Sequence, residues 1–152
     1  FIKQREEENV KKFDISKLIG DVILDAKRNG DTITPVSIET IDAEIRISAM
    51  RRAITNLSSN ACREGSKVEI SLLKQSSHAL IIIDDNGPGI KEENFTNVFK
   101  PFYRIETSRN LSTGGLGLGM TIARDIARSH GGDVKLNKSP LGGLRATLSI
   151  PI

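Results

Sequence analysis

The chain has 152 residues, of which 38% are hydrophobic and 27% charged, a composition typical of one soluble globular domain. Its net charge of +3 (22 basic minus 19 acidic side chains) is too small to indicate nucleic-acid binding, although it leaves an anionic ligand possible. The single cysteine excludes an internal disulfide and a cysteine-based zinc site.

The ends of the chain carry no targeting or membrane signal. No apolar run reaches the roughly 18 residues of a membrane span, and no signal peptide is visible. Residues 1–12 are charged and lack an apolar stripe, so we expect a linker or the end of a preceding helix there. We therefore expect a cytosolic domain over residues 13–152, cut from a longer protein and making no membrane contact itself.

The first half of the domain predicts two helices and two short strands. Asp14 or Ser16 can cap a helix that ends at Asn29-Gly30-Asp31. Its apolar face contains Leu18, Ile19, Val22, Ile23 and Ala26. Alternation predicts a half-buried strand through Val36 and Ile38 and a second strand through Ile45 and Ile47. Ser48 can cap the next helix, over about residues 49–64.

The second half predicts two hairpins separated by a long loop and a helix. Residues 67–73 alternate, and the continuous apolar run 79–83 is typical of a central strand. A helix over about 116–130, with Leu118, Ile122 and Ile126 on one face, stops at Gly131-Gly132. Strictly alternating residues then end the chain as a hairpin. We predict an α/β two-layer sandwich, a mixed and mostly antiparallel sheet with three main helices on one face.

Polar side chains share one stripe of the predicted helix 49–64. Asn56, Asn60 and Arg63 are spaced i, i+4 and i+7, about 120° around the axis from an apolar stripe. An amide oxygen suits Mg²⁺ and an arginine suits a phosphate. The alternative is the solvated face of an amphipathic helix.

Two glycine-containing segments follow. Asp84 to Gly89 comes directly after the buried strand, where a carboxylate can accept a hydrogen bond from a ligand amino group and glycines allow close approach. A plain turn after the strand is the alternative. The run Thr113 to Gly119 opens a helix, whose free N–H groups form an anion site, but it matches neither a dinucleotide fingerprint nor a Walker motif.

Four of the six aromatic residues lie within residues 95–103. A long loop over 86–114 with such apolar anchors is typical of a lid, and a small helix packed on the core is the alternative. His78, His130 and Cys62 have no matching motif, and we expect none of them to be catalytic.

In this order, the motifs resemble those of the catalytic ATP-binding domain of sensor histidine kinases, in the superfamily shared with gyrase B, Hsp90 and MutL. The segment 56–61 resembles the N box and 85–89 the G1 box. The segment 99–104 resembles the F box and 115–118 the G2 box. The segments 131–133 and 139–145 are similar to those of EnvZ-like osmosensor kinases. The resemblance implies a Bergerat-type fold with a lid over about 86–114.

The resemblance implies roles for individual residues. Asn60 would hold Mg²⁺, supported by Asn56, while Arg63 and Arg104 would complete the catalytic set. Asp85 would receive the adenine amino group, partly through water. The other expected ATP contacts are Glu64, Gly87, Gly89, Ile90, Phe99, Phe102, Tyr103, Thr113, Gly114, Gly115, Leu116, Gly117 and Leu118.

Two features of the sequence depart from the pattern of the family, and a third distinguishes the kinases of the superfamily from its ATPases. Glu64 stands where many relatives have a tyrosine that flanks the nucleotide, and Thr113-Gly114 stands where many have Gly-Thr. Asn56 replaces the glutamate that activates water in the ATPase relatives, and an amide cannot take up a proton. Slow water attack favours a kinase over a hydrolase.

The leading hypothesis is therefore a domain that binds Mg·ATP and passes the γ-phosphate to a histidine. That histidine would lie on a dimerisation domain of the same full-length protein, in the bacterial inner membrane, with a response regulator as the next partner. The isolated chain should bind ATP without phosphorylating itself. A nucleotide-gated interaction module, a free-standing ATPase and a serine-protein kinase remain open alternatives.

Overall fold

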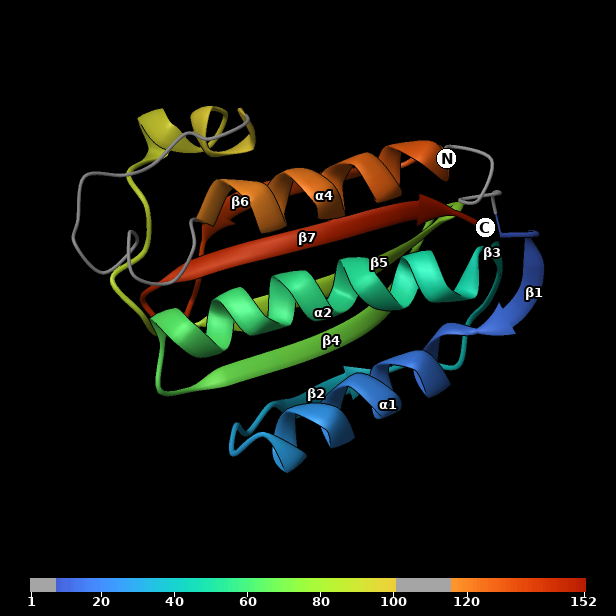
Figure 1. Cartoon of the computed structure of the whole chain (residues 1–152), viewed down its shortest axis with the longest axis horizontal. Coiled ribbons are helices and arrows are strands. Elements are labelled where there is room, and N and C mark those ends of the chain that lie inside the picture. The colour runs from blue at the N-terminus through green and yellow to red at the C-terminus, as the bar shows by residue number, and fades with distance from the viewer. Residues whose placement is uncertain (1–7, 101–115) are drawn as a thin grey trace, which may run out of the picture.

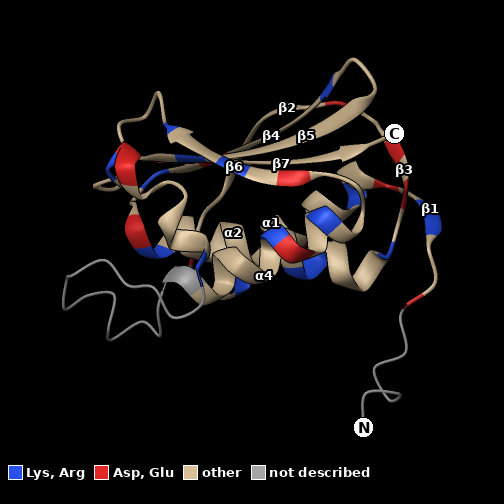
Figure 2. Ribbon diagram, turned by 90° about the horizontal axis from the view of Figure 1, so that it is seen from above, with Lys and Arg blue, Asp and Glu red and all other residues tan. Residues whose placement is uncertain are grey.

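The computed structural model describes residues 8–100 and 116–152. Within them, a five-stranded sheet with the strand order β2-β4-β5-β7-β6 carries α1, α2 and α4 on one face (Figures 1 and 2). A separate two-stranded sheet pairs β1 with β3. The predicted two-layer sandwich is confirmed. In the part of the chain described, no helix has the length and apolar character needed to span a bilayer.

The elements have the following bounds. The strands are β1 (Lys11–Asp14), β2 (Thr34–Ile38), β3 (Asp42–Ile45), β4 (Val68–Gln75), β5 (His78–Asp85), β6 (Asp133–Lys138) and β7 (Leu144–Pro151). The helices are α1 (Ile15–Arg28), α2 (Ile47–Glu64) and α4 (Leu116–Ser129). Two short 3-10 turns cover Glu92–Asn94 and Asn97–Phe99.

The sheet is mixed because β2 runs parallel to β4, whereas the β4–β5, β5–β7 and β7–β6 pairs are antiparallel. The predicted strand through Val36 and Ile38 is present as β2, but it is an edge strand: Ile38 packs partly buried on the core, whereas Val36 is 59% exposed. Pro35, which has no N–H to donate, coincides with a register shift against β4. The apolar run of β5 does lie at the centre of the sheet, as predicted.

Two expectations near the start of the chain need correction. Lys11 and Lys12, assigned to a linker, belong to β1 and pair with Ile45 and Glu44 of β3. Ile47 was expected to continue a strand, but it begins α2, and Arg46 rather than Ser48 is the N-cap. The alternation through Ile45 and Ile47 is too short to distinguish a strand end from a helix start.

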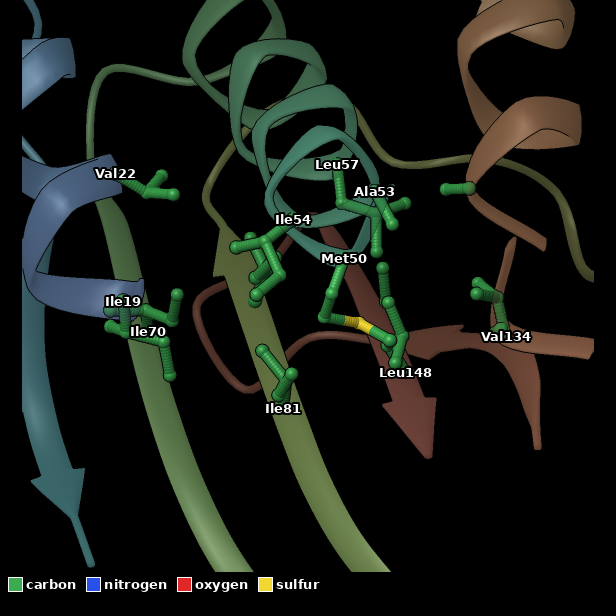
Figure 3. Packing of buried hydrophobic residues seen from close by; sticks show 14 of the residues in the cluster. Ile19, Val22, Met50, Ala53, Ile54, Leu57, Ile70, Ile81, Val134 and Leu148 are labelled. Atoms are coloured by element: carbon green, nitrogen blue, oxygen red, sulfur yellow. The ribbon is translucent and has the colours of Figure 1, made fainter. Parts of the chain in front are cut away.

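The core lies between the sheet and the helices. Met50, Ala53, Ile54 and Leu57 project from α2 toward Ile81 of β5 and Leu148 of β7 (Figure 3). Ile19 and Val22 of α1 lie over Ile70 of β4 in the same view. The 3.6-residue spacing of apolar side chains in α1 and α2 therefore matches the period-2 spacing of the inward sheet positions.

The buried face of α4 differs from the predicted one. Met120, Ala123 and Ala127 are buried, whereas Leu118 is 51% exposed and Ile122 and Ile126 are only partly buried. Two of these three buried side chains, Ala123 and Ala127, are small, whereas Met120 is among the largest side chains buried in the described residues. The helix ends at Gly131, whose φ of +88° is favourable only for glycine, as the predicted stop requires.

Candidate functional site

The functional candidates of α2 lie along its C-terminal half. Asn56 is half-buried and Arg63 exposed, but Asn60 is only 5% exposed. Among the described residues, the fully buried side-chain polar atom that lacks a hydrogen-bond partner is Ser58 Oγ on the same helix, and the Asn60 amide is not such an orphaned group. An amide oxygen suits Mg²⁺ as a ligand, so Asn60 stays a candidate for holding a metal ion. Because Asn60 is buried, the polar stripe is not solvated along its whole length.

Asn56 connects α2 to the first turns of α4. Its Nδ2 donates to the carbonyl oxygen of Gly119 over 3.5 Å, and a Cβ on Gly119 would lie 4.0 Å from the Cβ of Asn56. Gly119 closes the glycine-rich run 113–119 that the sequence indicated as an anion site, although no ATP contact was expected of it individually.

Asp85 ends β5 and is 1% exposed. Its Oδ1 accepts hydrogen bonds from the backbone N–H of Gly87 at 2.8 Å and of Leu144 at 3.2 Å. Burial raises the pKa of this carboxyl and the charge of Asp84 adds to the rise, while the two backbone donors partly offset it. Its Oδ2 has no partner among the described residues, so it can accept a hydrogen bond from a ligand.

The turn after Asp85 lies directly against the end of α2. A Cβ on Gly87 would collide with the backbone carbonyl of Glu64. Gly89 has a φ of +75°, a backbone conformation that side-chain-bearing residues rarely adopt, and Ile90 after it packs partly buried on the core. The glycines at these positions are thus required by backbone contact and by turn geometry.

Asn86 was missed by sequence reasoning as a structural partner of this turn. Its Oδ1 accepts from the N–H groups of Ser66 and Lys67, both at 2.8 Å, and its Nδ2 donates to Ser66 Oγ at 3.1 Å. These bonds tie the turn after β5 to the loop between α2 and β4. The Asn86-Gly87 pair therefore fixes Asp85 relative to the end of the helix that carries Asn60.

Phe99 is held by α4 at two points. Thr121 Oγ1 donates to the Phe99 carbonyl oxygen at 2.7 Å, and the Arg124 guanidinium lies 4.3 Å from the centroid of the Phe99 ring. Arg124 Nε in turn donates to Asp133 Oδ1 at 3.0 Å. Phe95 and Phe99 pack on the core, so this part of the expected lid resembles the alternative of a small helical segment packed on the domain.

The remaining predicted positions divide between α4 and the undescribed segment. Phe102, Tyr103, Arg104, Thr113, Gly114 and Gly115 lie outside the residues that the structure describes. Leu116 and Gly117 open α4, and Leu118 is exposed there. The C-terminal end of α2, the end of β5, the start of α4 and the start of β7 all lie at one end of the molecule (Figure 1).

The comparisons with known proteins agree with this geometry. Residues 45–152 match the family described as histidine kinase-, DNA gyrase B- and HSP90-like ATPase. The chain is 44% identical to the sensor protein RstB of Escherichia coli over 111 residues, covering 72% of this chain and 26% of RstB. It is 37% identical to the E. coli sensor histidine kinase CpxA, covering 69% of this chain and 23% of CpxA. The chain thus spans about a quarter of the length of these relatives.

Solved structures show the same fold. The ATP-binding domain of PrrB from Mycobacterium tuberculosis is 28% identical, with a TM-score of 0.79 over 95% of this chain and 98% of that one. The histidine kinase domain of the E. coli osmosensor EnvZ is 28% identical, with a TM-score of 0.72 over 97% of this chain and 92% of that one. Since the family match spans well over half of the chain, the protein belongs to the histidine kinase-, DNA gyrase B- and HSP90-like ATPases, as an ATP-binding domain of the sensor histidine kinase type.

Proposed function

We propose that this domain binds Mg·ATP and presents the γ-phosphate to a histidine on a dimerisation domain of the same full-length protein. The observation that carries the proposal is Asp85, a buried carboxylate with one oxygen fixed by two backbone donors and the other available. The available oxygen suits the exocyclic amino group of adenine. The named relatives RstB and CpxA, a sensor protein and a sensor histidine kinase, support the kinase assignment.

The buried amide of Asn60 fits a Mg²⁺ ion that takes its other ligands from water and phosphate oxygens. Among the described residues there is no group of three or more acidic, histidine or cysteine side chains that could hold a metal by themselves. Mg²⁺ would neutralise developing charge on the phosphates when bound. Arg63 is exposed near the same end of α2 and would add positive charge beside them.

In the proposed transfer, a ring nitrogen of the acceptor histidine attacks the γ-phosphorus atom. The bond between that phosphorus and the β–γ bridging oxygen breaks, ADP leaves with the electron pair, and the imidazole releases a proton to solvent. Asn56 has no base function, so it supports positioning rather than activation of water. This favours a kinase over the free-standing ATPase.

The histidines within the described residues are poor acceptors. Both ring nitrogens of His130 are engaged, because Nε2 accepts from the Arg46 N–H at 3.0 Å and Nδ1 lies 2.8 Å from the Ile126 carbonyl oxygen. His78 begins β5 and is half-buried within the sheet. We therefore place the acceptor in the dimerisation domain, and a response regulator after it, in a full-length protein of the inner membrane.

A labelling assay tests the proposal. The chain is incubated with ATP labelled at the γ-phosphate, alone and together with the dimerisation domain of its own full-length protein. We expect an acid-labile label on the dimerisation domain and none on this chain, with little free phosphate released. Label on His78 or His130 would contradict the acceptor assignment, and rapid phosphate release would favour an ATPase.

The interaction-module alternative has one specific observation in its favour. Glu64 places a carboxylate, rather than an aromatic ring, at the end of α2 beside the turn that contains Gly87. Binding of ATP without any transfer to the dimerisation domain would favour this alternative over the kinase.

A further inference from the structure

Gly143 and the first residues of β7 contact the last residues of β5. We propose that Gly143, Leu144 and Arg145 form a clamp that positions Asp85 and thereby makes the site selective for a purine with an exocyclic amino group rather than a ring carbonyl. The inference rests on the proposed function, since it concerns the base of the nucleotide bound there. Gly143 to Arg145 are positioning residues in this proposal, because they act through Asp85.

The clamp fixes the rotation of the Asp85 carboxylate. Leu144 N–H and Gly87 N–H both donate to the same oxygen, Oδ1. Gly143 N–H donates to the backbone carbonyl of Asp85 at 3.1 Å. Because both side-chain bonds end on Oδ1, the carboxylate keeps Oδ2 as a directed acceptor for the ligand.

Close approach explains why position 143 is glycine. A Cβ at this position would collide with Asp85 Oδ1, and it would lie only 2.6 Å from both the Asp85 carbonyl oxygen and the Gly87 nitrogen. Two of these neighbours are backbone atoms and the third is a carboxylate oxygen held by two hydrogen bonds. A side chain at position 143 therefore has to displace Asp85 or the turn that follows it.

Arg145 acts on Asp85 through the adjacent residue. Its Nε and Nη2 donate to the two carboxylate oxygens of Asp84 at 2.8 and 2.9 Å, across the β5–β7 pair. Asp84 is 8% exposed, and its charge contributes to the raised pKa of Asp85. A guanidinium that neutralises Asp84 weakens the repulsion between the two carboxylates and so favours the ionised form of Asp85, and only the ionised carboxylate is purely an acceptor.

The protonation state of Asp85 decides which base it favours. An ionised carboxylate accepts from an amino group, whereas a protonated one can donate to a ring carbonyl such as that of hypoxanthine or guanine. The other ionisable groups around Asp85 are few. Cys62 of α2 is coupled electrostatically to Asp85, Arg63 and Glu64 end that helix, and Glu69 faces Asp84 from β4. Among them, Arg145 is the cation in direct contact with Asp84.

The test compares ATP with inosine triphosphate, which has a carbonyl in place of the adenine amino group and an N1–H donor in place of the N1 acceptor. Calorimetric titration at fixed Mg²⁺ gives the ratio of the two dissociation constants for the wild type, Gly143→Ala, Arg145→Met and Arg145→Lys. Gly20→Ala is the control for adding a side chain at a glycine, because a Cβ on Gly20 of α1 has open space and its φ is not positive. Arg28→Met is the control for an exposed arginine paired with an aspartate.

We expect the ATP preference of the wild type to fall by about ten-fold or more in Gly143→Ala and Arg145→Met, and to stay unchanged in both controls. Arg145→Met should also lose ATP binding at a higher pH than the wild type, and Arg145→Lys should restore most of that shift because it keeps the charge. Thermal melting confirms that each variant is folded, and if Gly143→Ala does not fold, the two Arg145 variants decide the result.

The result that would overturn the proposed function differs from the result that would overturn the clamp alone. A wild type that binds no ATP would overturn the proposed function and the clamp together. A wild type that prefers ATP, with Arg145→Met keeping the same preference and the same pH profile, would overturn the clamp and leave the proposed function intact.

Discussion

At the scale of single residues, the site combines two polar groups that are buried. Asp85 is a charged group at 1% exposure and Asn60 an amide at 5%, and burial of such groups is unfavourable unless they are hydrogen-bonded or bound to a ligand. Cys62 differs, because burial raises the pKa of its thiol to about 11, which keeps it protonated and unreactive at neutral pH. We therefore expect the carboxylate and the amides, rather than the thiol, to carry the proposed function at this end of the molecule.

The raised pKa of Asp85 predicts a conflict between stability and binding. A carboxyl whose pKa is higher in the folded state destabilises the fold at every pH above that value, and the penalty disappears below the ordinary value of 3.8. Asp85→Asn keeps an oxygen for both backbone donors but removes the charge. We expect an equal or higher melting temperature at pH 7, together with weaker ATP binding.

Urea unfolding of the wild type and Asp85→Asn between pH 3 and pH 8 checks this prediction. The stability difference in favour of the variant should be largest at neutral pH and should shrink as the pH falls. A variant that is clearly less stable at pH 7 would show that the ionised carboxylate stabilises the fold, contrary to our reading of its environment.

At the scale of elements, α2 is fixed at both ends by distant parts of the chain. The side chain of its N-cap residue, Arg46, makes no capping hydrogen bond to the helix, and the first turn contains no acidic residue. Glu8 supplies the missing acceptor, because its carboxylate accepts from the N–H groups of Ser48 at 2.9 Å and Ala49 at 3.2 Å. His130 joins the end of α4 to the same end of α2.

Glu8→Ala tests the importance of this cap. We expect a loss of about 0.5–1 kcal/mol in the free energy of unfolding at pH 7, the usual effect of removing a helix cap. The backbone hydrogen bond from Ser48 lowers the pKa of Glu8, so its contribution is present above the ordinary value of 4.5 and is lost as the pH falls through the lowered value.

Denaturant unfolding at pH 7 and below pH 4 measures that difference, with Glu44→Ala on β3 as the control for an exposed glutamate. An effect of Glu8→Ala no larger than that of the control would mean that the Glu8 carboxylate does not contribute to the stability of α2.

At the scale of the whole molecule, the sequence predicts what depends on local signals. The apolar stripes of α1 and α2, the central position of β5, the stop of α4 at Gly131 and the sandwich architecture follow from periodicity and turn residues. The prediction of the buried face of α4 was wrong, because it was based on Leu118, Ile122 and Ile126, whereas the structure buries Met120 and two alanines more deeply. Hydrophobicity alone does not encode that choice of face.

The candidate site also has some features that the sequence predicts locally and others that it does not. Asp85 and Asn60 stand out locally, as a carboxylate after an apolar strand and an amide on a polar helix stripe. The contacts that position these residues have no local sequence signal, because Leu144 is 59 residues from Asp85 in the chain and Glu8 is 40 residues from Ser48. Such pairings are fixed by the register of β5 with β7 and by the entry of the chain beside α2, and neither appears in any short window of sequence.

Calorimetric titration of the wild type and Asp85→Asn with ATP, with and without Mg²⁺, is the most direct test of the claim that this end of the fold is a Mg·ATP site built on Asp85. We predict that the wild type binds ATP, that Mg²⁺ strengthens the binding, and that Asp85→Asn weakens it by about ten-fold or more while remaining folded. Equal affinity of the folded variant and the wild type, or no binding by a folded wild type, would contradict it.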